Sequence, residues 1–140
     1  MLAPSRSDKV SVKSLRLGPL EARIMDVIWE RGESVVREVM PYVGPLAYTT
    51  VMTTMARLYK KGFLDRYKEG FSFVYRSRFT KEGWRRKCTE AFVDEYFSQS
   101  LGTDLLISTL LDTAQLRDKA VLAELERKIR LKRKELNKAS

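Results

Sequence analysis

The chain has 140 residues, of which 44% are hydrophobic and 32% are charged, and its formal net charge is +9. This length suits one cored domain with an extension, and the composition excludes a disordered chain. The sequence holds no histidine and one cysteine, Cys88, which excludes Ser-His and Cys-His nucleophile pairs and the usual zinc sites. We therefore expect a protein that is not an enzyme and has no cofactor, and the lone cysteine favours a cytoplasmic location.

Positive charge gathers in two parts of the chain. Residues 47–78 contain seven Lys or Arg and two acids, and residues 113–140 contain nine and four. Patches of this kind are typical of proteins that bind a polyanion, although a solvated basic surface has the same composition. Residues 1–16 lack the apolar core of a secretory signal and are predicted to form a flexible basic arm.

Two helices are predicted before residue 45. Apolar residues recur at helical spacing over Pro19–Arg31, between a Gly-Pro start and a stop at Gly32. A short second helix follows, for which Ser34 is the predicted N-cap and Pro41 helps to end the helix. The sequence PYVGP is interpreted as a turn.

A third helix and a hairpin complete the predicted domain. The helix begins near Ala47 or Tyr48 and ends at about Lys61. The segments FLDRYK and FSFVYRSRF flank Glu69-Gly70, which predicts a two-stranded antiparallel hairpin. The predicted fold is therefore mainly α with a small β-hairpin, in the order of a winged helix-turn-helix domain.

The third predicted helix has two different sides. At about 100° per residue, Val51, Met55 and Leu58 share one narrow sector, which is the predicted core side. The opposite side and its edges carry Thr49, Thr50, Met52, Thr53, Ala56, Arg57 and Lys60. Threonine is a mediocre helix former, but its hydroxyl can reach phosphates or base edges and its methyl can contact thymine. We expect this side to read DNA, and an ordinary solvated surface is the alternative.

The segments LGPLEARIMDVIWERG, SVVREV and AYTTVMTTMARLYKKGFLDR resemble the penicillinase-repressor family, which includes repressors of β-lactamase and methicillin-resistance genes. The similarity covers Leu17 to about Asp112 and is most specific in the YTTV and RLYKKG block. The resemblance implies a winged-helix homodimer that binds an inverted-repeat operator in double-stranded DNA and represses transcription. The DNA-binding residues that we predict on this basis are Tyr48, Thr49, Thr50, Met52, Thr53, Arg57, Lys60, Lys61, Arg66 and Lys68, the last two on the wing.

Two features found in parts of this family are absent from the sequence. The β-lactam-responsive members are cleaved at an Asn-Phe bond, which the segment LLISTLL lacks, and the copper-responsive members carry a cysteine cluster. Neither form of induction is expected here. Cys88 lies on an apolar helix side and is expected to pack there rather than act as a redox switch.

A helical dimerisation region is predicted at residues 80–140, after a winged-helix DNA-binding domain at 17–79. Helices are expected at Lys81–Phe97, at DLLISTLLD and over LRDKAVLAELERKIRLKRKEL. One small domain cannot bury all their apolar sides, so a second copy is the expected partner, with a core inside one chain as the alternative. The basic end of the last helix either adds nonspecific DNA contact or is solvated.

Two other functions remain open at the level of sequence. A winged helix can serve as a protein-interaction module, and a basic surface can bind RNA. An RNA-binding sheet needs aromatic side chains that stack on bases. The alternation of Phe71, Phe73 and Tyr75 with Ser72 and Val74 instead predicts that these aromatic rings face the core.

Overall fold

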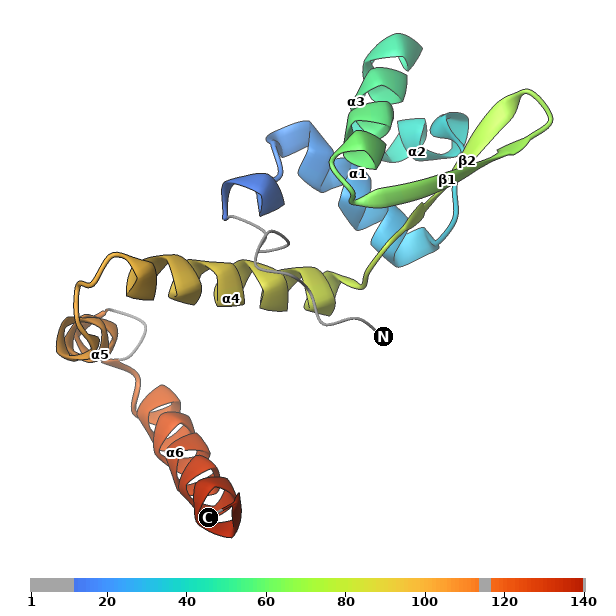
Figure 1. Ribbon diagram of the computed structural model, residues 1–140. Helices are drawn as coiled ribbons and strands as arrows, with labels where there is room; N and C mark the ends of the chain where they lie inside the picture. Colours follow the sequence, from blue (N-terminus) through green and yellow to red (C-terminus); the bar gives the residue numbers. More distant parts are fainter. Residues whose placement is uncertain (1–11, 114–116, 140) are drawn as a thin grey trace. The chain divides into compact units, whose positions relative to one another are not determined.

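A computed structural model describes residues 12–113 and 117–139 of the chain (Figure 1). In chain order its elements are the 3-10 turn η2 (Lys13–Leu15), α1 (Pro19–Arg31), α2 (Val36–Val43), α3 (Tyr48–Lys60), β1 (Leu64–Glu69), β2 (Ser72–Ser77), α4 (Lys81–Ser98), α5 (Thr103–Asp112) and α6 (Lys119–Ala139). The chain forms two compact units, Met1–Glu95 and Tyr96–Ser140, which divide within α4. Three helices followed by a two-stranded hairpin confirm the predicted winged helix-turn-helix class.

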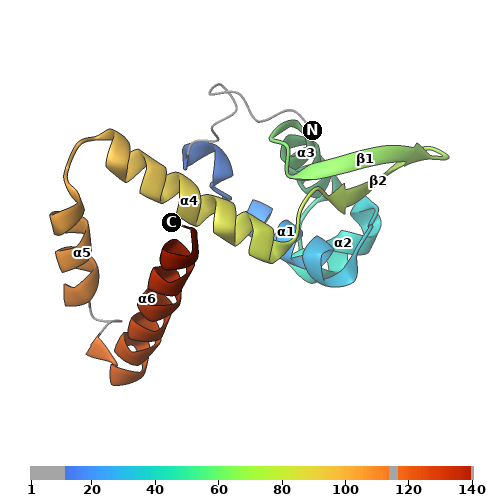
Figure 2. The same ribbon diagram turned by 60° about the horizontal axis from the view of Figure 1, so that its bottom comes forward.

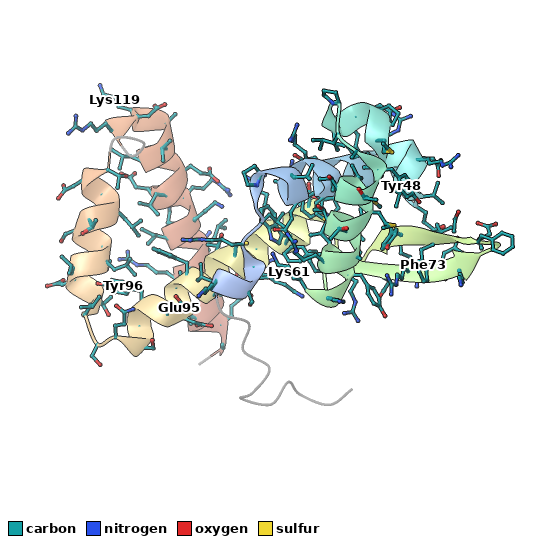
Figure 3. All side chains as sticks on the ribbon, turned by 90° about the horizontal axis from the view of Figure 1, so that it is seen from above. Tyr48, Lys61, Phe73, Glu95, Tyr96 and Lys119 are labelled. Carbon is teal, nitrogen blue, oxygen red and sulfur yellow. The ribbon has the colours of Figure 1, made fainter. Side chains whose placement is uncertain are left out.

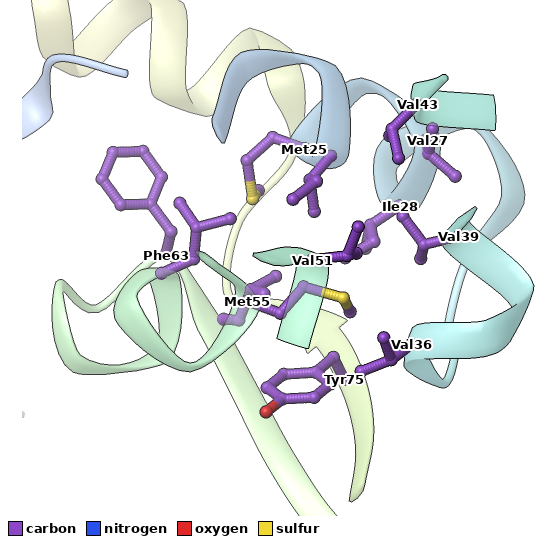
Figure 4. Packing of buried hydrophobic residues seen from close by; sticks show 13 residues of the cluster. Met25, Val27, Ile28, Val36, Val39, Val43, Val51, Met55, Phe63 and Tyr75 are labelled. Carbon is purple, nitrogen blue, oxygen red and sulfur yellow. The ribbon is translucent and has the colours of Figure 1, made fainter. Parts of the chain in front are cut away.

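The core of the first unit lies between α1, α2, α3 and the base of the hairpin (Figure 4). The predicted core side of α3 is confirmed, because Val51, Met55 and Leu58 are all fully buried. The other buried members are Ile24, Met25, Val27, Ile28, Val36, Val39, Val43, Phe63, Leu64 and Tyr75. Burial of each such side chain contributes about 1.5–3 kcal/mol, so this cluster is the main source of stability for the unit.

Helix α1 has the predicted bounds for identifiable reasons. Pro19 occupies the first helical position, where its missing N–H costs nothing. The Glu21 carboxylate turns back and accepts a hydrogen bond of 2.9 Å from the Gly18 N–H. Gly32 ends the helix at a φ of 86°, a conformation that favours glycine.

Helix α2 corrects two predictions. Ser34 is not its N-cap: Ser34 is buried and forms a two-way backbone bridge with Tyr75, at 3.0 and 2.9 Å. The Val35 N–H is instead capped by the Glu38 carboxylate at 3.0 Å. Pro41 does not end the helix, and the predicted PYVGP turn is wrong over its first three residues, which are helical. Arg37 and Pro41 are both exposed, so water can satisfy the carbonyl that the proline leaves without a partner.

The predicted antiparallel hairpin is confirmed, but its turn lies one residue later than the predicted Glu69-Gly70, because Glu69 still pairs with Ser72. β1 and β2 pair antiparallel from Leu64↔Ser77 to Glu69↔Ser72, so Gly70 and Phe71 form a two-residue turn. Gly70 has a φ of 64°, and Phe71 is not among the residues with positive φ. A two-residue turn with positive φ only at its first residue is the type II′ geometry, in which glycine is preferred at that position. Figures 1 and 2 show the hairpin projecting beyond the three helices of its unit.

Tryptophans attach η2 and the start of α4 to the winged domain. The Trp84 indole N–H donates to the Leu15 carbonyl at 3.0 Å, and its ring lies 5.4 Å from the Trp29 ring. The Trp29 N–H in turn donates to the Ser77 hydroxyl at 2.9 Å. Leu15 is buried, where the sequence predicted part of a flexible arm; residues 1–11 of that arm lie outside the described residues.

The second unit contains the end of α4, with α5 and α6. The structure gives neither α5 nor α6 a buried residue. Large apolar side chains are exposed on these elements: Phe97, Leu101, Leu105, Ile107, Leu110, Leu111, Val121, Ile129, Leu131 and Leu136. Over the residues that the structure describes, no helix combines the length and apolar character that crossing a membrane requires.

An ion pair joins the end of α3 to the start of α1. The Lys61 ammonium lies 3.1 Å from one oxygen of Glu21 and also donates to the Arg16 carbonyl at 3.0 Å. Burial alone raises the pKa of Glu21, but the Gly18 N–H and the Lys61 charge hold that pKa below its usual value. The pair therefore stabilises the fold fully above the unfolded carboxyl pKa of about 4.3, and this contribution is lost as the pH falls through the lower folded value.

Replacement of Lys61 by methionine should therefore destabilise the protein by about 1–2 kcal/mol at pH 7, because the buried Glu21 carboxylate loses its cation. Lys60→Met is the matched control, since Lys60 is exposed and should stay within about 0.5 kcal/mol of the wild type. Urea unfolding at pH 7 and at lower pH measures both, and the Lys61 effect should shrink on acidification. Equal losses for the two variants would contradict this role of the ion pair.

Candidate nucleic-acid interface

The outer side of α3 is a continuous exposed surface of small hydroxyls, apolar groups and cations. Ala56 on this helix is half-buried. The exposed residues are Tyr48, Thr49, Thr50, Met52, Thr53, Arg57 and Lys60. Except for Tyr48, they lie opposite the buried Val51, Met55 and Leu58. Tyr48, labelled in Figure 3 at the start of the helix, is exposed at the end of the core side, seven residues before Met55. The backbone thus presents, on the outer side, six of the ten residues predicted to bind DNA.

One threonine of the run behaves differently from the others. Thr54 is buried, and its hydroxyl donates to the Thr50 carbonyl at 2.7 Å. This bond within the helix satisfies the hydroxyl without a partner from another element. Thr54 therefore belongs to the packed side of α3, while Thr49, Thr50 and Thr53 leave their hydroxyls to the solvent side.

The wing corrects the prediction for its aromatic residues. Only Tyr75 faces the core; Phe71 at the tip is fully exposed and Phe73 is 38% exposed. The alternation was interpreted correctly, since Phe73 and Tyr75 do share one side of the strand. The core, however, ends at the base of the hairpin, so a residue two positions further out has no helix above it.

Arg66 connects the wing to α3. Its guanidinium carbon lies 4.1 Å from the centre of the Tyr59 ring on α3 and 4.1 Å from the centre of the Phe73 ring on β2. Its Nη1 also lies 3.4 Å from the Tyr75 hydroxyl, to which it donates. Stacking of a planar guanidinium between two rings is an arrangement that lysine cannot reproduce. Arg66 therefore has a structural partner on each side.

The predicted cations differ in how free their charges are. Lys60 and Arg57 lie on the exposed side of α3. Lys68 is exposed on the wing, 5.7 Å from the centre of the Phe73 ring. Lys61, labelled in Figure 3, is instead held by Glu21 and the Arg16 carbonyl. The structure thus leaves Arg57, Lys60 and Lys68 exposed and engages Lys61 within the fold.

Cys88 lies on the side of α4 that faces η2. Its sulfur is 4.0 Å from the Leu15 carbonyl oxygen, and burial raises the pKa of its thiol. A raised pKa keeps the thiol protonated at neutral pH, which suits a packing residue and not a reactive thiolate. Within residues 12–113 and 117–139, no group of three His, Cys, Asp or Glu side chains is placed to hold a metal ion.

Sequence reasoning missed the Tyr59–Arg66–Phe73 stack. A signal for part of it was present, because a two-residue turn at Gly70-Phe71 aligns Arg66 opposite Tyr75, on the same side as Phe73. The contribution of Tyr59 was not visible, since it depends on how α3 crosses the hairpin.

Comparisons with known proteins point to one family. The sequence model of the penicillinase repressor family matches residues 17–136. The penicillinase repressor of Bacillus licheniformis is 26% identical over 94 residues, which cover 65% of this chain and 73% of that protein. The transcriptional regulator BlaI of Mycobacterium tuberculosis is 46% identical over 56 residues, covering 37% and 41% respectively. The crystal structure of transcriptional regulator Tm0710 from Thermotoga maritima aligns with a TM-score of 0.46 and 21% identity, over 86% of this chain and 82% of that one.

The two sides of α3 should respond differently to the same substitution. Thr53→Ala should change the free energy of unfolding by no more than about 0.5 kcal/mol, as expected for an exposed position. Thr54→Ala should cost about 1–2 kcal/mol, because it removes a buried methyl group and a satisfied hydroxyl. Urea unfolding of the two variants gives both values. A costly Thr53→Ala would mean that this residue is packed and not presented.

Proposed function

The chain belongs to the penicillinase repressor family, and we propose that it represses transcription as a homodimer that reads an inverted-repeat operator. The family consists of DNA-binding transcriptional repressors and not of enzymes. The expected partner of this chain is therefore duplex DNA. The observation that carries the proposal is the exposed outer side of α3, opposite a fully buried side. We also propose that the protein works in the cytoplasm, where bacterial DNA is accessible to it.

We propose that base reading is concentrated in the first two turns of α3. A recognition helix usually directs its N-terminal residues at base edges in the major groove. Thr49, Thr50, Met52 and Thr53 lie there, with Tyr48 at the first position. The short threonine side chains allow the helix to approach DNA closely. Their hydroxyl groups can contact base edges and phosphates, and their methyl groups can contact the methyl group of thymine. This supports sequence-specific binding over a protein-interaction module, which has no need of such groups.

Cations around this surface fit the phosphate backbone. Arg57 and Lys60 follow the reading residues along α3, and Lys68 extends from the wing. Contacts of this kind fix the orientation of the protein on DNA but carry no sequence information. We assign Arg66 and Lys61 to positioning as well as charge, because both have partners inside the winged domain.

The second unit supports a dimer. The exposed apolar side chains of α5 and α6 form helix sides that one chain leaves uncovered. A second copy of the chain offers the same apolar sides in return, as a two-fold interface requires. We propose winged-helix domain limits of 17–79 and a dimerisation region of 80–140, although Trp84 and Ala91 of α4 also pack within the first unit.

Selection of binding sites from random duplex DNA tests the reading surface. The wild type should enrich an inverted repeat. The triple variant Thr49→Ala, Thr50→Ala, Thr53→Ala should lose about 1–3 kcal/mol of discrimination for each good base contact removed, with nonspecific affinity nearly unchanged. Lys68→Ala is a control that removes a phosphate contact and not a base contact. It should weaken binding to all sequences alike and lower the salt slope by about 0.9 for each protomer. If the triple variant still discriminates between the operator and other sequences, the bases are read by another element.

Disruption of one apolar side of α5 tests the dimer. Ile107, Leu110 and Leu111 lie on one side of that helix, at spacings of three and four residues. Leu111→Glu should raise the dimer dissociation constant at least about tenfold, which corresponds to about 1.4 kcal/mol. Ser108→Glu adds the same charge at another exposed position of α5 and should leave the dimer intact. Sedimentation velocity measures both, and a monomeric wild type at micromolar concentration would refute the dimer.

A further inference from the structure

The C-terminal half of α6 carries more positive charge than the second unit can neutralise. Residues 127–139 contain seven Lys or Arg and a single acid, and every one of these residues is exposed. Arg127 pairs with Glu124, and Lys132 pairs with Glu135. Five cations of this segment have no ion pair among the residues that the structure describes: Lys128, Arg130, Arg133, Lys134 and Lys138.

Three of these cations form a row on one side of the helix. Arg130, Lys134 and Lys138 follow one another at intervals of four residues, so the row extends over about 12 Å of the helix axis. At about 100° per residue it lies opposite the apolar side, which holds Leu122, Leu125, Ile129 and Leu136. Glu126 lies four residues before Arg130, one turn before the row begins, and Glu124 and Glu135 lie about 40° or more beyond its other edge. The row itself contains no acid.

A second copy of α6 does not supply the missing negative charge. In a parallel coiled coil built on the apolar side, Lys128 of one helix would lie beside Arg133 of the other, which places like charges together. Lys132 would occupy a core position of the same seam. The excess charge thus persists in a dimer and calls for a polyanion.

We propose that the row Arg130, Lys134 and Lys138 is a second DNA-binding surface, which contacts phosphates and does not read bases. This inference rests on the proposed function, in which operator DNA is already bound through α3. An acidic lipid surface fits less well. A membrane-bound amphipathic helix inserts its apolar side into the lipid, whereas the proposed dimer already covers the apolar side of α6 with a second copy of the chain.

Charge replacement in the full-length chain tests the surface. The row variant is Arg130→Gln, Lys134→Gln, Lys138→Gln. The control is Lys128→Gln, Lys132→Gln, Arg133→Gln, which removes the same charge from the apolar side itself, at Lys132, and from its two borders, at Lys128 and Arg133. Affinity is measured against salt concentration on the selected operator and on a random duplex. The row variant should lower the slope of log affinity against log salt by about 0.9 per lost contact, up to about 2.7 for each protomer of the proposed dimer. The ratio of operator to random affinity should not change, and sedimentation should show the same oligomeric state.

Each other outcome overturns the inference in a distinguishable way. An unchanged slope in the row variant means that the row does not contact DNA. An equal decrease in the control means that only the net charge of the protein matters. Loss of binding to phosphatidylserine vesicles with unchanged DNA binding assigns the row to lipid. A wild type that prefers no sequence refutes the proposed function, and the slope on random duplex then still decides whether the row binds DNA.

Discussion

The rotation of α3 about its own axis is the constraint on which the candidate interface depends. Val51, Met55 and Leu58 are fully buried against the other two helices, and each contributes about 1.5–3 kcal/mol by leaving water. A turn by one residue would expose part of this set and bury polar groups in its place. The outward direction of Thr49 and Thr53 is therefore a result of core packing. The reading surface needs no interaction of its own to be held in position.

Two polar contacts fix the surroundings of α3 in the same way. The Lys61–Glu21 pair joins its C-terminal end to α1, and the Arg66 stack joins it to the wing. Each uses a cation that sequence alone would assign to DNA. Charge near the proposed reading helix thus has a structural use beside the DNA contacts that we propose for it. A cation with a structural role lies close to an acid or an aromatic ring of its own chain, and a cation free to contact DNA does not. The sequence alone does not give these distances.

Local rules predicted most of the domain, and tertiary context decided the rest. The bounds of α1 follow from its Gly-Pro start and Gly32, and the hairpin follows from alternation around Glu69-Gly70. Ser34 failed as a predicted N-cap because its backbone is needed by β2, a partner forty residues away in the chain. Phe73 failed as a core residue because the alternation of a strand says which side a residue lies on, but not how far the core extends along it.

The bridge between Ser34 and Tyr75 has a consequence for the sheet as a whole. It occupies the free edge of β2 at the point where that strand is most buried, so another chain cannot add a strand there. The outer edge of β1 is protected by different means, since Asp65, Arg66, Lys68 and Glu69 crowd it with charge. A two-stranded sheet with both edges guarded resists aggregation through strand addition. In the proposed dimer, association between copies is thereby left to the helices.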